Sequence, residues 1–225
     1  MALHIDAEPR PLVGAQLEAP AWPDADTIYR LDPPKAFPQR DLLDILRSRR
    51  SRSGGQAHID LIGTILHYST ELREKRKDGR FGYWESRTSP SAGGIHGVRV
   101  CLVPISSTEP LGLYLPDEHA LASFNEPAVV RKEAVRLLDD LQLPRAGYLL
   151  QLVANVRSYA ERYEDSETLL LRDAGALCMT ITLVAEAFGA SSRVLGHLDR
   201  GVVSAMSLGP DYAGVGGVHI TAKGA

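Results

Sequence analysis

The sequence predicts one domain of the α+β class, in which helices and strands intermix along the chain. Four helix patterns and several strand patterns follow one another without the strict strand–helix–strand alternation of a parallel sheet. No long polar or low-complexity segment divides the 225 residues. With 44% hydrophobic residues and a formal net charge of −3, the composition is that of an ordinary soluble globular protein with a sizeable core.

The first 40 residues form a proline-rich arm ahead of this domain. Residues 1–40 contain half of the 14 prolines. Proline fixes φ and lacks an amide donor, so we expect no helix and little sheet in the arm. It is either a flexible tail or an extended arm laid along a partner's surface. The domain proper then spans residues 41–225.

The first half of the domain combines helix patterns with short strand patterns. In the segments Asp41–Arg50 and His58–Arg76, apolar residues recur on one face of a helix, and Leu72 belongs to the apolar face of the second segment. A segment rich in β-branched residues then predicts a strand, and a turn at Pro116–Asp117 predicts a hairpin. The predicted elements are helices over Asp41–Arg50 and His58–Arg76, a loop over Lys77–Gly94, a strand over Val98–Ile105 and a hairpin over Gly112–Leu121.

The second half contains the longest helix signal of the sequence. Between Glu167 and Gly189 the apolar positions alternate steps of four and three, and Gly189 supplies the stop. The other faces are also uncharged between Ala174 and Ala185, so we expect this helix to be buried nearly all round. The remaining predicted elements are a helix over Glu126–Leu143 and strands over Gly147–Val156, Ser191–Gly196 and Val215–Gly224.

Composition and absent motifs exclude several classes of function. The net charge argues against a nucleic-acid partner, and the uncharged stretch Ala174–Ala185 is shorter than the ~20 residues of a membrane span. No nucleophile elbow, phosphate-binding P-loop or zinc-protease motif is present, and the seven histidines lack metal-ligand spacing. We therefore expect neither a hydrolase nor a metal site. Cys101 and Cys178 lie in apolar runs typical of a reducing compartment, which predicts a cytoplasmic protein.

Arginines and serines alternate directly after the first helix, in the segment Arg47–Gly55 (RSRRSRSGG). Guanidinium groups grip phosphate oxygens bidentately, and hydroxyl groups with glycine-exposed amides complete an anion cradle. A solvated basic helix end explains the same residues, because cations are favoured at a helix C-terminus. A nucleic-acid patch would need more basic surface around it.

Small residues precede the strand that begins at Val98. In Ser89–Gly94 (SPSAGG), Pro90 stiffens the backbone, while Ser91, Ala92, Gly93 and Gly94 allow amides and a hydroxyl group to face a ligand closely. Taken alone, the segment is better explained as a plain turn leading into the strand.

The two segments together, in this order, resemble the flavin-dependent nitroreductase superfamily. The SagB-type dehydrogenase branch is the most similar, with a PSAGG loop, a hairpin similar to Gly112–Leu121 and a long helix followed by VLG. The resemblance covers residues 41–225. It implies a central mixed, mostly antiparallel sheet flanked by helices, with the helix 167–189 at a homodimer interface that binds FMN.

The resemblance also implies roles for particular residues. Tyr159 matches the tyrosine of a catalytic Lys-Tyr pair, and Arg157 or Arg162 could lower its pKa by charge proximity. Arg87 could add a positive group near the phosphate. The residues that match cofactor-binding positions are Arg49, Arg50 and Ser51 at the FMN phosphate and ribityl chain, Pro90, Ser91, Ala92, Gly93 and Gly94 beside the ribityl and ring, Leu195 and Gly196 against the ring, and Lys223 near the phosphate.

Two positions depart from the SagB-type pattern. Ser158 stands where azoline-oxidising members have lysine, and Gly97 stands where the loop has proline. The leading hypothesis is an FMN-dependent oxidoreductase that oxidises a heterocycle in a modified peptide or a related small molecule, with a biosynthetic partner enzyme. The alternatives are an NAD(P)H-dependent nitro or quinone reductase and a non-catalytic partner protein with the same fold.

Overall fold

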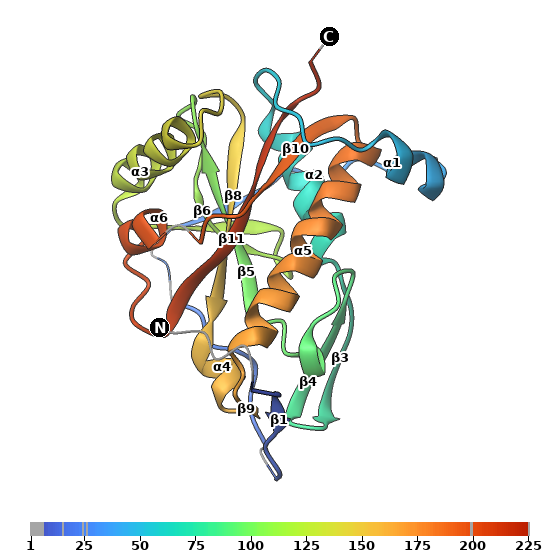
Figure 1. The fold of residues 1–225 in the computed structure, drawn as a ribbon, viewed down its shortest axis with the longest axis vertical. Helices are drawn as coiled ribbons and strands as arrows, with labels where there is room; N and C mark the ends of the chain where they lie inside the picture. Colours follow the sequence, from blue (N-terminus) through green and yellow to red (C-terminus); the bar gives the residue numbers. More distant parts are fainter. Residues whose placement is uncertain (1–6, 15, 24, 26, 199, 225) are drawn as a thin grey trace.

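A computed structural model describes residues 7–14, 16–23, 25, 27–198 and 200–224. It has a central seven-stranded sheet with α2 and α5 on one face and α3 and α6 on the other (Figure 1). This arrangement confirms the α+β class. The helices are α1 (Leu42–Ser48), α2 (Ile59–Thr70), α3 (Pro127–Asp140), α4 (Val156–Ala160), α5 (Glu167–Ala187) and α6 (Arg200–Ala205), with a 3₁₀ turn η1 at Ala92–Gly94.

The sheet is antiparallel at every pairing of named strands in the described chain. Its order is β10-β11-β8-β5-β6-β7-β2. A single parallel bridge joins Ser51 to Ser192 at the outer edge of β10, so the sheet is mostly antiparallel, as predicted. The strands are β10 (Ala190–Leu195), β11 (Tyr212–Ala222), β8 (Tyr148–Asn155), β5 (Val98–Pro104), β6 (Gly112–Leu115), β7 (Ala120–Ser123) and β2 (Ile28–Arg30).

Two apolar cores cover the two faces of the sheet. Along β5, Val100 and Leu102 pack toward α2 and α5, whereas Cys101 and Val103 pack toward α3 and α6. This alternation follows from the two-residue period of a strand. All eight residues of β8 are buried, which explains why its sequence is almost continuously apolar.

The long helix α5 is only partly covered by its own chain. Ile181 and Ala185 are fully buried against the sheet, but Met179 is 42% exposed and Gly175 has open space beside it. The prediction of burial nearly all round is therefore wrong for the single chain. By length and composition α5 could span a membrane, yet 56% of its most apolar window is buried within the protein. Its apolar residues serve the core of the domain.

A hairpin replaces the last five residues of the predicted helix 58–76 and most of the predicted loop 77–94. Helix α2 ends at Thr70, and β3 (Leu72–Gly79) pairs with β4 (Gly82–Arg87). The charged residues after Leu72 favour a helix by propensity but provide no apolar face to bury. Pairing with β4 satisfies their backbone groups instead, through a glycine-bounded turn that sequence reasoning treated as loop.

The proline-rich arm lies on its own domain over its described residues. Strand β2 extends the central sheet by pairing with β7, and β1 (Arg10–Pro11) pairs with β9 (Tyr163–Glu164). Leu17 forms a parallel bridge to Gly82. Both alternatives considered for the arm, a flexible tail and a segment on a partner's surface, are thus corrected for these residues. The arm forms short β-pairings with the domain, and these pairings satisfy backbone groups that the prolines prevent from forming a helix.

Candidate functional site

The residues predicted to bind a cofactor fall into two groups near opposite ends of α5. One group adjoins Glu186 in the last turn, and the other adjoins Asp173 in the second turn. Thirteen positions separate these residues, or about 20 Å at ~1.5 Å per residue. Within one chain, the two arginine-bearing loops therefore do not converge on one phosphate, contrary to the expectation for Arg87.

The first group, the basic cluster, consists of residues 47–53 and Lys223. The amide nitrogen of Arg52 donates to the carbonyl oxygen of Ser192 at 3.3 Å, and the amide nitrogen of Ala222 donates to Gly55 at 3.1 Å. Lys223 Nζ lies 3.3 Å from Oε1 of the buried Glu186. These contacts hold the arginine-rich segment beside the C-terminal strand, so the structure brings Ser51 and Lys223 into one region.

The basic cluster matches a phosphate group because it is positively charged and contains hydrogen-bond donors that have no partner among the described residues. Glu186 offsets Lys223, and Arg50 donates to the carbonyl oxygens of Arg47 and Arg49. The side chains of Arg49 and Arg52 form no hydrogen bond or ion pair with any residue that the structure describes. Ser53 Oγ is buried and also lacks a partner among these residues. Two free guanidinium groups and a buried hydroxyl group can hold a dianionic phosphate.

Leu195 and Gly196 follow the basic cluster along β10. Leu195 is buried in the α3–α6 core, so its side chain serves packing, and only its backbone can face a ligand. Gly196 has open space where a Cβ would stand. The prediction that this backbone segment lies against a flavin ring stays a prediction.

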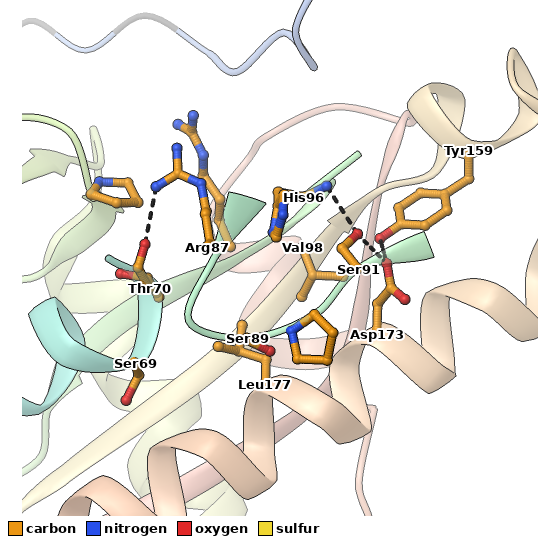
Figure 2. Close-up of a pocket in the computed structure, with 13 residues that line it drawn as sticks. Ser69, Thr70, Arg87, Ser89, Ser91, His96, Val98, Tyr159, Asp173 and Leu177 are labelled. Carbon is orange, nitrogen blue, oxygen red and sulfur yellow. Dashed lines mark hydrogen bonds between the residues drawn. The ribbon is translucent and has the colours of Figure 1, made fainter. Parts of the chain in front are cut away.

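The second group lines a small cavity between α2, β4, β5 and α5 (Figure 2). The cavity offers about 40 Å³ to water-sized molecules, and a wider hollow of about 290 Å³ shares one of its walls. Four predicted site residues meet here, namely Arg87, Pro90, Ser91 and Tyr159. The cavity is lined by Ser69, Thr70, Arg87, Ser89, Pro90, Ser91, His96, Val98, Arg99, Pro116, Tyr159, Asp173 and Leu177.

Asp173 organises one side of this cavity (Figure 2). Its carboxylate accepts hydrogen bonds from Ser91 Oγ, from the Ala92 amide at 3.0 Å and from Tyr159 Oη at 2.6 Å. Ser91 Oγ also accepts from the His96 amide at 2.9 Å. The hydroxyl group and the amide that were expected to face a ligand are therefore used within the protein. They fix the loop to α5.

Tyr159 is fully buried, and its environment opposes the predicted lowering of its pKa. Burial, and then the negative charge of Asp173, raise the pKa of Tyr159 well above its ordinary value. Arg157 pairs with Glu161 on the surface, and Arg162 donates to the carbonyl oxygens of Ser158 and Glu18. Neither arginine activates the phenol. Tyr159 can donate a proton or a hydrogen bond, but it cannot serve as a base near neutral pH.

The two glycines of the loop are explained by packing and backbone conformation. Gly94 has φ +65°, and a Cβ there would lie 2.3 Å from Cδ1 of Trp84. A Cβ on Gly93 would approach the Tyr163 hydroxyl at 2.8 Å and Phe81 at 3.0 Å. The small residues therefore make room for aromatic side chains of the same chain, which corrects the expectation that they make room for a ring and ribityl chain.

Arg87 belongs to an ion-pair network and not to the basic cluster. It donates to Glu85, to Asp117 at 2.9 Å and to the Thr70 carbonyl oxygen at 3.0 Å. Burial favours its neutral form, but hydrogen bonding and charge from Glu85 outweigh this and raise the pKa of Arg87. Arg87 is thus a fixed cation in the cavity wall.

The two departures from the SagB-type pattern are in contact with each other. A Cβ on Gly97 would lie 2.5 Å from Cε2 of Tyr159 and 2.6 Å from Oγ of Ser158. Ser158 is buried, and its hydroxyl group donates to the Asn155 carbonyl oxygen at 2.8 Å. Any side chain at position 97 would displace Tyr159, so glycine at 97 and serine at 158 form one local arrangement.

Sequence reasoning missed Asp173, Glu186 and Arg99. Asp173 had a readable signal, because it lies three positions after Leu170 and four before Leu177, on the buried stripe of the helix. A carboxylate on such a stripe must have buried partners. Arg99 had no comparable signal, since its surroundings come from three separate segments.

Comparison with solved structures identifies the fold. A candidate nitroreductase from Ralstonia eutropha JMP134 matches with a TM-score of 0.67 and 20% identity, over 97% of this chain and 99% of that chain. The Escherichia coli microcin synthetase McbBCD with truncated pro-MccB17 bound matches with a TM-score of 0.59 and 20% identity, over 77% of this chain and 69% of that one. A candidate nitroreductase from Desulfovibrio desulfuricans in complex with FMN has a TM-score of 0.52 and 12% identity, over 81% and 86%.

These matches place the chain in the nitroreductase-like fold class. At such identities they define the fold alone. No family model and no curated protein matches the sequence. Cofactor, reaction and partners therefore follow from the site and are treated as proposals.

Proposed function

We propose that this protein is an FMN-dependent oxidoreductase with a nitroreductase-like fold. The observation that carries the proposal is the basic cluster, where the side chains of Arg49 and Arg52 and the buried Ser53 hydroxyl group have no partner among the described residues. The FMN-bound relative with the same fold supports the choice of cofactor. When bound, the flavin accepts or donates a hydride.

This chain's own residues bind and orient the groups around that reaction. Arg49 and Arg52 would hold the phosphate together with the hydroxyl groups of Ser51 and Ser53, and Lys223 stays paired with Glu186 at the border of this site. At the other end of α5, Asp173 holds the Pro90–Gly94 loop and the Tyr159 hydroxyl group in place. With its raised pKa, Tyr159 keeps its proton and donates a hydrogen bond near neutral pH.

A homodimer would complete the site. The two groups lie about 20 Å apart on one chain, and two α5 helices related by a twofold axis would bring one subunit's loop toward the other's basic cluster. The face available for pairing includes Met179 on α5. It also includes Leu42, Leu43 and Leu46 on α1, which are 44–60% exposed.

The substrate we propose is a heterocycle in a modified peptide or a related small molecule. Support comes from the likeness to the microcin synthetase complex, which was solved with a truncated precursor peptide bound. That assembly also motivates a biosynthetic partner enzyme for this chain. An NAD(P)H-dependent nitro or quinone reductase uses the same cofactor and remains the second candidate.

The colour of the purified protein tests the proposal. We expect flavin absorbance bands, and FMN should be released on denaturation. Slow or absent bleaching by NAD(P)H without oxygen favours a dehydrogenase, whereas rapid bleaching favours the reductase. A colourless protein that FMN cannot reconstitute would overturn both enzyme functions and leave a non-catalytic partner protein.

Loss of the phosphate contacts should weaken FMN binding. The double variant Arg49→Gln with Ser51→Ala removes two hydrogen-bond donors to a charged group, which we expect to cost about 3 kcal/mol, or roughly a hundredfold in Kd. Titration of apoprotein followed by flavin fluorescence measures this. Arg136→Gln, an exposed arginine on α3, is the matched control. Equal affinity of the double variant and the control would place the phosphate elsewhere.

A charge on the open face of α5 should separate the subunits. In Met179→Glu, a carboxylate would be buried at the proposed interface without a partner, so we expect a monomer at concentrations where the parent protein is a dimer. Sedimentation velocity measures the mass. Val129→Glu on α3 is the control, because Val129 is also 42% exposed. If the dimer persisted in Met179→Glu but dissociated in Val129→Glu, the interface would lie on the α3 face and not on the α5 face that we propose.

A further inference from the structure

The cavity beside Asp173 contains a cation without a counterion. Arg99, on β5, stacks its guanidinium group 4.6 Å from the Trp22 ring centre. Its nitrogen atoms form no hydrogen bond or ion pair with any residue in the described part of the chain. Ser89 lines the same cavity, and its buried Oγ also lacks a partner among those residues. Arg99 is half-buried, whereas the Ser89 hydroxyl group is desolvated, and a buried donor without a partner is costly unless a ligand satisfies it.

Among the charged groups around the cavity, Arg99 is a cation with no carboxylate in direct contact with it among the described residues. Burial, and then the neighbouring Arg87, lower the pKa of Arg99 to about 10, so it stays charged at neutral pH. Glu85 and Asp117 are the carboxylates that act on it most, and both are already paired with Arg87 and Lys75. Asp173 lies across the cavity, with its oxygens taken by Ser91, Ala92 and Tyr159.

The size and donors of the cavity select a small planar anion. About 40 Å³ accommodates a few heavy atoms but no ring, and the adjoining hollow of about 290 Å³ has room for the rest of a larger molecule. A carboxylate carries one negative charge and matches the guanidinium fork bidentately. A phosphate dianion would bring two negative charges into a cavity that already contains the Asp173 carboxylate.

We propose that this cavity anchors a carboxylate group of the substrate, with Arg99 as the binding cation and Ser89 as a second donor. The inference rests on the proposed function, because Ser91 and Tyr159 of the proposed site line the same cavity. Arg87 contributes its positive charge from the wall while its ion pairs stay intact. The substrate is then an organic acid, or a peptide that presents a carboxylate beside the group to be oxidised.

Binding of simple carboxylates to the full chain tests the site. Calorimetric titration with acetate, benzoate and inorganic phosphate at constant ionic strength gives the affinities. We expect saturable binding of acetate and benzoate and weaker binding of phosphate. Arg99→Gln should weaken carboxylate binding by at least about tenfold, and Arg99→Lys, which keeps the charge without the fork, by less. Arg136→Gln is the control, an exposed arginine on α3 that lines neither the cavity nor the wider hollow.

Three results would overturn the carboxylate site: phosphate binding more tightly than benzoate, no saturable carboxylate binding, or equal affinity in Arg99→Gln and Arg136→Gln. If Arg99→Gln does not fold, Arg99→Lys and Ser89→Ala carry the test. Flavin content is measured on the same samples. A protein that contains flavin but does not bind carboxylates would overturn the carboxylate site and leave the proposed redox function standing. A colourless protein that binds them through Arg99 overturns the proposed redox function and leaves the anion site standing.

Discussion

Asp173→Ala is expected to lower the free energy of unfolding by about 3–5 kcal/mol. The carboxylate is buried and accepts from Ser91 Oγ, the Ala92 amide and Tyr159 Oη. Removing it leaves three donors without an acceptor, two of them in the loop that lines the cavity. Urea unfolding followed by circular dichroism measures the loss.

Two variants control for this result. Tyr159→Phe removes only one of the three hydrogen bonds and should cost about 1–2 kcal/mol. Arg172→Ala changes the exposed neighbour of Asp173 on α5 and should stay within about 0.5 kcal/mol of the parent protein. If Asp173→Ala were as stable as Arg172→Ala, the carboxylate would not hold the loop to α5.

Gly94→Ala is expected to lower the free energy of unfolding by about 2–4 kcal/mol. A side chain at φ +65° is strained, and the added methyl group would lie 2.3 Å from Cδ1 of Trp84 and 2.8 Å from the Glu85 carbonyl oxygen. Both effects act together, because the loop cannot move away while Asp173 holds it. Thermal and urea unfolding both measure the change.

The cause of that loss can be separated by a second substitution. Combining Gly94→Ala with Trp84→Ala removes the overlapping indole, so the two changes should cost less together than the sum of their separate costs. Gly55→Ala is the matched control, since nothing lies within 4 Å of the added Cβ. Strict additivity would mean that the indole does not dictate glycine at position 94.

Elements whose pattern follows from burial were predictable from the sequence. The continuous apolar run of β8 and the stripe of α5 reflect the core directly, and their ends were correct to within two residues. The β3–β4 hairpin was not predictable in the same way. Its outer strand is almost entirely exposed, so no periodicity marks it, and local helix propensity pointed to the wrong structure.

The candidate site was predictable as a set of segments but not as a geometry. Local chemistry identified the arginine-rich segment and the Pro90–Gly94 loop. Their separation along α5 could not be read from the sequence, because it depends on which strands pair. The same holds for Trp84, which fills the space beside Gly94 from a strand that was expected to be loop. Small residues in a sequence indicate close approach, but they do not say what approaches.

The first quarter of the chain contributes to both edges of the central sheet. Strand β2 pairs with β7 at one edge, and the Ser51–Ser192 bridge covers part of β10 at the other. An uncovered edge presents free amide and carbonyl groups that can recruit strands from other molecules. Strand β2 of the arm therefore pairs the backbone groups of β7, which keeps them from recruiting a strand of another molecule. Removal of the first 40 residues would expose the backbone of β7 and favour aggregation, even though the basic cluster and the residues that line the Asp173 cavity are kept.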